Sequence, residues 1–159
     1  MALLKRGPFW ALLGGVIIGC PGVPLRSDGS PADEKCPAGA REAMAALDLD
    51  PGAGFSVFVD ASRKGTGLPL IVSDGPIESE TLLPAEKFPG RTRLQGRIWT
   101  SGPRVVIRYY SARLPDGKVI PFCAVAADDG PGLPKSPGRP GFAALQHSTA
   151  PVYVTGQFK

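Results

Sequence analysis

The chain has 159 residues, of which 21 are glycine and 18 are proline, and its formal net charge at pH 7 is +4. Because glycine and proline interrupt regular helices, this composition excludes a long helical bundle. Hydrophobic residues make up 43% and charged residues 20% of the chain, which suits one apolar core and argues against a polyelectrolyte tail. We therefore expect one small domain.

Residues 1–19 have the composition of a secretory signal. Lys5 and Arg6 precede an uncharged, mostly apolar run from Gly7 to Gly19. A membrane-spanning helix needs roughly 20 apolar residues, whereas the apolar core of a signal peptide needs only about 7 to 15. The length favours a cleaved signal peptide, and the alternatives are an uncleaved anchor and an ordinary buried first element.

The end of this segment, Ile17-Ile18-Gly19-Cys20, resembles the bacterial lipobox. The resemblance implies that Cys20 receives diacylglycerol and becomes the first residue of the mature chain, so that a lipid anchor would hold the protein in the cell envelope. Pro21 stands where an aspartate retains lipoproteins in the inner membrane of some bacteria, and we therefore expect the outer membrane, facing the periplasm or the exterior.

Acylation of Cys20 would leave two cysteines, Cys36 and Cys123. In an oxidising compartment, an even pair is expected to form a disulfide. The alternative is two separately buried thiols. A zinc site is disfavoured because these cysteines and the sole histidine, His147, supply neither a CxxC pair nor four ligands, so we expect no metal and no cofactor.

Charge is distributed unevenly along the chain. Residues 20–86 hold five basic and 11 acidic side chains, whereas residues 87–159 hold 11 basic and three acidic ones. If the two halves fold against each other, the charges complement one another internally; if they separate, they leave a basic face for an anionic partner. We favour internal complementarity.

The mature chain begins with a predicted tether and one short helix. Residues 20–35 are rich in proline, glycine and charge, which predicts a flexible, solvated tether behind the lipidated cysteine. A helix is expected between Cys36 and Leu47, since Pro37 suits a first helical turn and Pro51-Gly52 ends the pattern. Strands are then expected at 55–60, at 69–72 and, from a weaker pattern, at 77–83.

Residues 92–126 have the clearest strand pattern. Strands over 93–100, 104–114 and 118–126 are separated by Ser101-Gly102-Pro103 and by the turn Pro115-Asp116-Gly117, which predicts a three-stranded antiparallel meander. Residues 128–141 are rich in proline and glycine and predict a mobile loop, and a last strand is expected within 150–158. We therefore expect a single mainly β domain over 36–159, a small antiparallel β-sandwich or partly open barrel with one short N-terminal helix.

Several of these segments also carry a family resemblance. TRLQGRIWT at 92–100, Arg104-Val105, LPDGK at 114–118 and Pro121-Phe122-Cys123 resemble a family of uncharacterised myxobacterial envelope proteins, often lipoproteins, some of which are associated with serine/threonine kinases. The same pattern is faintly similar to the β-barrel domain of outer-membrane ring proteins in type IV secretion and conjugation systems. These resemblances imply a fold and a compartment rather than an activity.

No motif predicts catalysis. Gly52-Ala53-Gly54-Phe55-Ser56-Val57 lacks the third glycine of a kinase loop, and the chain has no HRD or DFG segment. His147 and Ser148 are adjacent, but no G-x-S-x-G elbow accompanies them. We therefore expect a non-enzyme that is not a kinase, and a hydrolase stays only as a less favoured alternative.

Strand parity predicts one candidate binding face, which lies near Trp99 and Tyr109. Its guanidinium groups could bind phosphate, a carboxylated glycan or an acidic segment of an envelope protein. The alternative is an outward face whose arginines pair with the acidic first half of the chain, with Trp99 in the core. The residues of this face are Arg93, Arg97, Arg104, Arg108 and Tyr110.

The sequence thus predicts a lipid-anchored, non-catalytic binding or assembly module of the cell envelope. Its expected partners are the membrane, an envelope protein or an anionic glycan, and nucleic acid is excluded because a lipidated protein outside the cytoplasm seldom meets it. The alternatives are a component of an envelope-spanning secretion or transfer apparatus and, less favoured, a small extracytoplasmic hydrolase.

Overall fold

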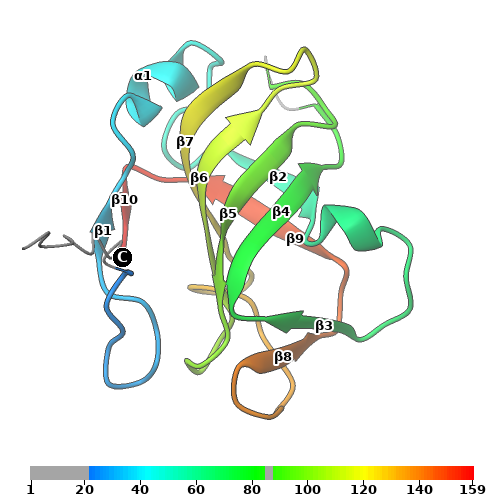
Figure 1. Ribbon diagram of the computed structural model, residues 1–159. Helices are drawn as coiled ribbons and strands as arrows, with labels where there is room; N and C mark the ends of the chain where they lie inside the picture. Colours follow the sequence, from blue (N-terminus) through cyan, green and yellow to red (C-terminus); the bar gives the residue numbers. More distant parts are fainter. Residues whose placement is uncertain (1–21, 85–87) are drawn as a thin grey trace, which may run out of the picture.

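A computed structural model describes residues 22–84 and 88–159, and this part of the chain is mainly β (Figure 1). The predicted signal peptide, residues 1–19, and the predicted acylation site, Cys20, lie outside the described residues. The small mainly β fold with one short N-terminal helix is confirmed. The elements in chain order are β1 (Glu34–Lys35), α1 (Ala40–Ala45), β2 (Gly54–Phe58), the 3₁₀ helix η1 (Ala61–Arg63), β3 (Leu70–Ser73), β4 (Gly75–Thr81), β5 (Arg93–Trp99), β6 (Val106–Arg113), β7 (Val119–Ala126), β8 (Phe142–Leu145), β9 (Thr149–Val154) and β10 (Gln157–Phe158).

Strands β2, β4, β5, β6, β7 and β9 form a closed barrel in that order, and β2 pairs with β9 to close it. Each barrel strand is antiparallel to its neighbours and pairs with the next barrel strand along the chain, which makes this an up-and-down barrel. The predicted meander is confirmed as β5, β6 and β7. Closure satisfies the backbone hydrogen bonds that the edges of an open sheet would leave free.

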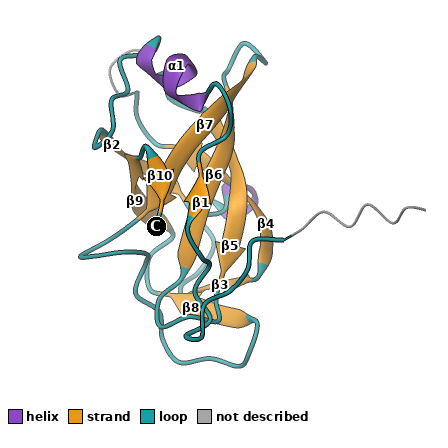
Figure 2. Cartoon of the chain, turned by 90° about the vertical axis from the view of Figure 1, so that its left-hand side faces the viewer, coloured by secondary structure: helices purple, strands orange, loops and turns teal. Residues whose placement is uncertain are grey.

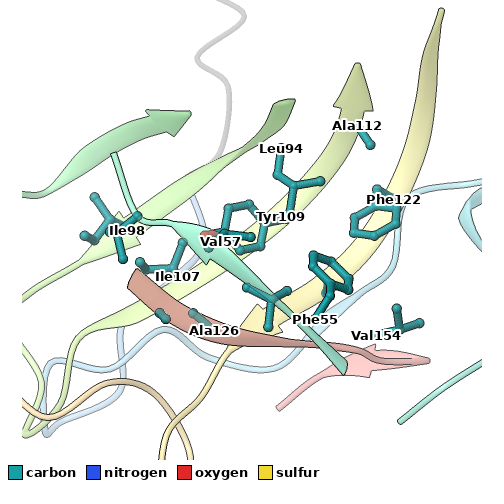
Figure 3. Close-up of a cluster of buried hydrophobic side chains, with 14 of the residues drawn as sticks. Phe55, Val57, Leu94, Ile98, Ile107, Tyr109, Ala112, Phe122, Ala126 and Val154 are labelled. Carbon is teal, nitrogen blue, oxygen red and sulfur yellow. The ribbon is translucent and has the colours of Figure 1, made fainter. Parts of the chain in front are cut away.

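Side chains fill the interior of the barrel (Figure 3). Burial alternates along β2, so that Phe55 and Val57 are buried while Ser56 is exposed. The ring of Phe122 stacks on that of Phe88 with centroids 5.4 Å apart and an interplanar angle of 4°, and Phe55 lies 5.1 Å from Phe88. The interior of the barrel is therefore a packed apolar core.

One polar group in this core is satisfied internally. The Ser79 hydroxyl donates to the carbonyl of Val59 at 2.6 Å, so the Tyr109 hydroxyl donates to Ser79 Oγ at 2.7 Å. Burial raises the pKa of the Tyr109 phenol above its ordinary value, although the hydrogen bond with Ser79 lowers it in part. Tyr109 is therefore a neutral hydrogen-bonding member of the core.

Helix α1 covers one end of the barrel. It is shorter than the segment predicted from the sequence because Gly39, at φ 78°, turns the chain immediately before the helix. Ala40 and Met44 are buried against β7, and the backbone N–H of Cys123 donates to Met44 Sδ at 3.4 Å. The helix thereby packs beside the late strand that carries Cys123.

Two small sheets lie outside the barrel (Figures 1 and 2). In the first, β1 pairs with β10, which brings the two described ends of the chain together through Glu34↔Phe158 and Lys35↔Gln157. In the second, β3 pairs with β8 over four residue pairs, from Leu70↔Leu145 to Ser73↔Phe142. Strands β1 and β8 and the short β10 pairing were not predicted from the sequence.

Residues 22–35, which we call the strap, belong to the segment predicted to be a flexible tether, and their backbone is paired. Leu25 forms a bridge with Pro31, Arg26 N–H donates to the carbonyl of Ser30 at 2.7 Å, and Ala32 N–H donates to that of Pro24 at 2.8 Å. The strap then enters the sheet at β1. Composition predicted a solvated coil, but backbone partners and a buried arginine described below hold the strap against the barrel.

The predicted mobile loop at 128–141 is irregular but is held at its centre. Leu133 is only 5% exposed, and it exchanges backbone hydrogen bonds of 2.8 and 2.9 Å with Val105. Ser136 N–H also donates to the carbonyl of Ala144 at 3.0 Å. Burial of this one leucine attaches the centre of the segment to the barrel.

Candidate functional site

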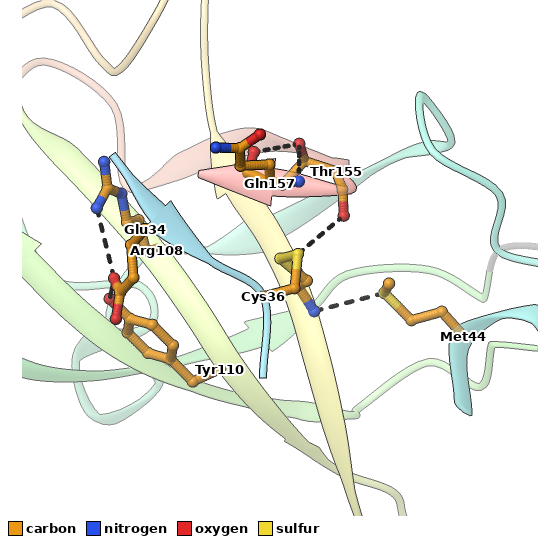
Figure 4. Close-up of a disulfide and its surroundings, with 8 residues drawn as sticks. Glu34, Cys36, Met44, Arg108, Tyr110, Thr155 and Gln157 are labelled. Carbon is orange, nitrogen blue, oxygen red and sulfur yellow. Dashed lines mark hydrogen bonds and ion pairs between the residues drawn. A yellow bond between two sulfur atoms is a disulfide. The ribbon is translucent and has the colours of Figure 1, made fainter. Parts of the chain in front are cut away.

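Cys36 and Cys123 form the predicted disulfide, with Cα atoms 5.5 Å apart and a sequence separation of 87 (Figure 4). Cys36 follows the strap directly, and Cys123 lies at the centre of β7. The bond therefore joins the end of the strap covalently to the barrel.

Arg108, on β6, is fully buried. Its Nη1 donates to the carbonyl of Ala32 at 2.8 Å, and its Nη2 donates to the carbonyl of Pro31 at 3.3 Å and to the main-chain oxygen of Lys159 at 3.2 Å. One cation thus binds the strap and the last residue at once. We call Arg108 and these acceptors the arginine clamp.

Aromatic rings enclose the guanidinium of the clamp. Arg108 Cζ lies 5.6 Å from the ring centroid of Trp99 and 5.3 Å from that of Phe158. Ring faces attract a cation, and the attraction is stronger where water is excluded. Trp99 is 5% exposed, so the rings also exclude water from the charge.

Glu34 supplies the countercharge of the clamp (Figure 4). Its Oε2 lies 3.4 Å from Arg108 Nη1 and accepts a hydrogen bond of 2.8 Å from the Tyr110 hydroxyl. Burial raises the pKa of the Tyr110 phenol well above its ordinary value, and the adjacent Glu34 raises it further. The group therefore stays protonated and donates to Glu34.

The backbone carrying the clamp is set by a close approach at Gly96. Gly96 pairs with Tyr109 at an irregularity in the β5–β6 register. A Cβ atom at Gly96 would lie 2.1 Å from the carbonyl oxygen of Arg108, a distance that no side chain tolerates. Glycine is required here for the strand that positions Arg108.

The predicted binding face is not a single surface. Arg93 binds the carboxylates of Glu78 and Glu80 at 2.8 and 2.9 Å, and Arg108 is buried in the clamp. These contacts join the basic second half of the chain to the acidic first half, as internal complementarity predicted. Arg97 is exposed, with its guanidinium 5.6 Å from the Trp99 ring centroid.

Arg104 is the member of the predicted set that lines a surface cleft next to the strap. Its Nη2 donates to the carbonyls of Asp128 and Gly132, while its buried Nε has no hydrogen-bond partner in the described part of the chain. The cleft has a volume of about 230 Å³. We call it the strap cleft, and its lining includes Arg26, Asp28, Ser30, Arg104 and Lys159.

A larger cleft of about 550 Å³ adjoins the strap cleft. The two share Val106, Pro131 and Lys159, and Arg108 contributes to the wall of the larger one. Arg26 and Lys159 were missed as site residues because one lies in a segment predicted to be a tether and the other follows the last strand. The excess of basic residues after residue 86 was a signal for Lys159, whereas Arg26 lies in the acidic first half and had none.

A third cleft, of about 240 Å³, lies beside His147. Leu133, Leu145 and Pro134 supply apolar lining, and Lys135 lies beside them. Within residues 22–84 and 88–159, His147 has no hydrogen bond to a hydroxyl, and the nearby Ser136 Oγ accepts from Gln146 Nε2 at 2.7 Å. The cleft therefore does not assemble a nucleophile and base.

No group of three or more His, Cys, Asp or Glu side chains in the described residues is arranged to hold a metal ion. The helices within the same ranges are too short or too polar to span a bilayer. No protein-family model, curated protein or solved structure matches the chain.

Proposed function

We propose that this protein is a lipid-anchored, non-catalytic binding or assembly module of the bacterial cell envelope. The clamped strap is the observation that carries the proposal. The strap begins at Gly22, two positions after Cys20, and the disulfide and the arginine clamp join it to the barrel. An acyl chain on Cys20 would therefore hold the barrel close to the membrane rather than on a long, flexible tether.

Three features of the sequence and structure support the envelope as its location. The first 19 residues have the composition of a signal peptide, and Cys20 completes a lipobox-like segment. The Cys36–Cys123 disulfide suits an oxidising compartment. The resemblance to myxobacterial envelope lipoproteins favours the same location, and the missing aspartate after Cys20 favours the outer membrane.

The test is the chemistry of the mature N-terminus. Membrane fractions from cells that produce the full chain should contain protein beginning at Cys20 and carrying the mass of a diacylglycerol group. Cys20→Ser should abolish the added mass and processing, whereas the matched substitution Ser27→Ala, at an exposed strap position, should change neither. Intact, unprocessed chain in the cytosol, with Cys36 and Cys123 both alkylatable in the folded state, would refute the proposal.

A second candidate function is a subunit of an envelope-spanning secretion or transfer apparatus. Within the described residues, β3 pairs along only one side, with β8. Ile71 on β3 is 47% exposed and Phe142 on β8 is 39% exposed. Free strand edges beside apolar side chains are a common means of adding a partner strand.

Gentle detergent extraction distinguishes the two functions. An apparatus subunit would migrate with a large complex on native gels, and Ile71→Lys would release it from that complex. Tyr153→Lys is the matched control, because Tyr153 is 43% exposed and lies on β9 rather than in the outer sheet. If the unsubstituted protein and the Ile71→Lys variant both migrate at the size of the single chain, the second candidate is refuted.

A further inference from the structure

The strap cleft has an excess of positive charge. Arg26, Arg104 and Lys159 contribute three cationic side chains, of which Arg26 also pairs with the exposed Asp33, and Asp28 contributes the one acidic side chain of the lining. Asp28 accepts hydrogen bonds of 2.9 and 2.5 Å from the backbone and hydroxyl of Ser30, which lower its pKa. This acidic side chain is thus already engaged with Ser30, and the cleft favours an anionic occupant.

Two buried donors lie at this cleft and at the cleft adjoining it. Arg104 Nε and Arg108 Nε are both buried without a hydrogen-bond partner in the described residues, and Arg108 is 0% exposed. A buried donor without an acceptor costs about 1 to 3 kcal/mol. Of the two residues, Arg104 lines the strap cleft itself, and guanidinium groups suit the geometry of phosphate.

The position of the strap places this cleft beside the proposed anchor. Arg26 follows Cys20 by six positions, and an extended chain spans at most about 3.5 Å per residue, or roughly 20 Å in all. Leu25, next to Arg26, is 53% exposed. An apolar side chain flanked by cations suits contact with the boundary between lipid headgroups and acyl chains.

We propose that the strap cleft binds the phosphate group of an anionic membrane lipid, with Arg26, Arg104 and Lys159 as the residues that contact it. The choice of a lipid over a soluble anion rests on the proposed acylation of Cys20, which would hold the cleft at the membrane surface. The bound headgroup would then fix the orientation of the barrel, because the strap is already joined to it.

The experiment uses the full chain carrying Cys20→Ser, so that no acyl group contributes, in a neutral detergent. Dihexanoyl phosphatidylglycerol should bind about tenfold more tightly than dihexanoyl phosphatidylcholine in a calorimetric titration. The double variant Arg26→Gln/Lys159→Gln should weaken phosphatidylglycerol binding by about tenfold, since each basic residue contributes to the attraction. Both side chains are exposed, so these substitutions should leave the fold intact.

The matched control is Arg113→Gln/Lys118→Gln. These residues are exposed at the opposite end of the β6–β7 hairpin and are absent from the lining of the cleft, so the same change in net charge should leave binding unchanged. Arg104→Gln is a secondary variant, because Arg104 also holds the Asp128 and Gly132 carbonyls. An equal loss of phosphatidylglycerol affinity in the two double variants would overturn the proposal, since it would show an effect of net charge alone.

Soluble probes separate the lipid from other anions. Inorganic phosphate and glucuronate should both bind more weakly than phosphatidylglycerol. Equal or tighter binding of either would refute a lipid ligand, and so would binding of the two lipids with equal affinity. If the protein selects phosphatidylglycerol but mass spectrometry shows that Cys20 is never acylated, lipid binding in the strap cleft is supported and the lipid anchor is refuted. If Cys20 is acylated but the protein does not select between the lipids, only lipid binding in the strap cleft is refuted.

Discussion

The two sheets outside the barrel are held to it by different forces. The β1–β10 sheet has two residue pairs, and around it lie a disulfide, a buried cation and a carboxylate. The β3–β8 sheet has four pairs and no charged residue in either strand. Its inward side chains Leu70, Val72, Ala143 and Leu145 are all at most 3% exposed.

The difference shows how the length of a sheet decides what must stabilise it. Four alternating pairs bury enough apolar surface to hold β3–β8 by the hydrophobic effect. Two pairs cannot, so the sheet that joins the chain ends depends on covalent and charge-assisted contacts. Substitutions in one sheet should therefore leave the other largely intact, and the variants below test that independence.

Loss of the disulfide should have the largest effect. Replacing both cysteines, Cys36→Ser/Cys123→Ser, frees a loop of 87 positions and should lower the free energy of unfolding by about 4 to 5 kcal/mol through chain entropy. Urea unfolding measures the loss. Hydrogen exchange should accelerate in β1 and β10 before it does in β3 and β8, and uniform acceleration would contradict the comparison.

Removing the charge of the clamp should have the next largest effect. Arg108→Gln leaves the strap carbonyls and Glu34 without their cation, and should cost about 3 kcal/mol. Arg113→Gln is the matched control on the same strand, where an exposed arginine should change stability by less than about 0.5 kcal/mol. Urea unfolding compares the two variants, and similar losses would show that Arg108 does not hold the strap.

A smaller side chain in the β3–β8 sheet tests whether apolar burial stabilises that sheet. Leu145 is 3% exposed, and Leu145→Ala should cost about 2 to 3 kcal/mol through lost burial and the cavity left behind. The exposed neighbour substitution Ile71→Ala should cost much less. Hydrogen exchange should increase in β3 and β8 while the β1–β10 sheet keeps its protection, and loss of protection in both sheets would show that they are coupled.

The smallest expected effect is a pH dependence that arises at Glu80 on β4. The hydrogen bond from Lys64 holds the pKa of Glu80 below 4.5, although burial opposes it, and the nearby Arg93 lowers it further. A depressed folded pKa stabilises the protein above the unfolded value, and this contribution is lost as the pH falls through the folded pKa. Glu80→Gln should reduce the slope of the free energy of unfolding against pH between about pH 5 and pH 3. An unchanged slope would show that other carboxylates cause this pH dependence.

Local sequence patterns were sufficient for the meander of the barrel but not for the β1–β10 sheet. The alternation in β5 to β7 and the turn at Pro115-Asp116-Gly117 predicted the meander, because strand period and turn chemistry are short-range properties. Strands of two residues, such as β1 and β10, are too short to show a period. The strap therefore had the composition of a tether although its backbone is paired.

The candidate site shows the same division at the level of single residues. Parity placed Arg93 and Arg97 on one strand and Arg108 on the next, and these two strands do pair through Arg97↔Arg108. Parity cannot show which of them another segment covers. The strap lies over Arg108 and leaves Arg97 exposed. The residues of the one predicted face therefore lie in different places: Arg108 in the buried clamp, Arg93 in a pair with carboxylates and Arg104 in the strap cleft.

By itself, the sequence determined the mainly β class, the meander and the short helix, because composition and side-chain period express these directly, and it indicated the disulfide partners once Cys20 was assigned to the proposed lipid anchor. Only the tertiary structure decided that Glu34, Arg108 and the last residue meet, since they are distant in sequence and each has an unremarkable local context. Their meeting depends on the closing of the barrel and on the path of the strap across it. Long-range contacts of this kind set which charges are buried and which remain available to a partner.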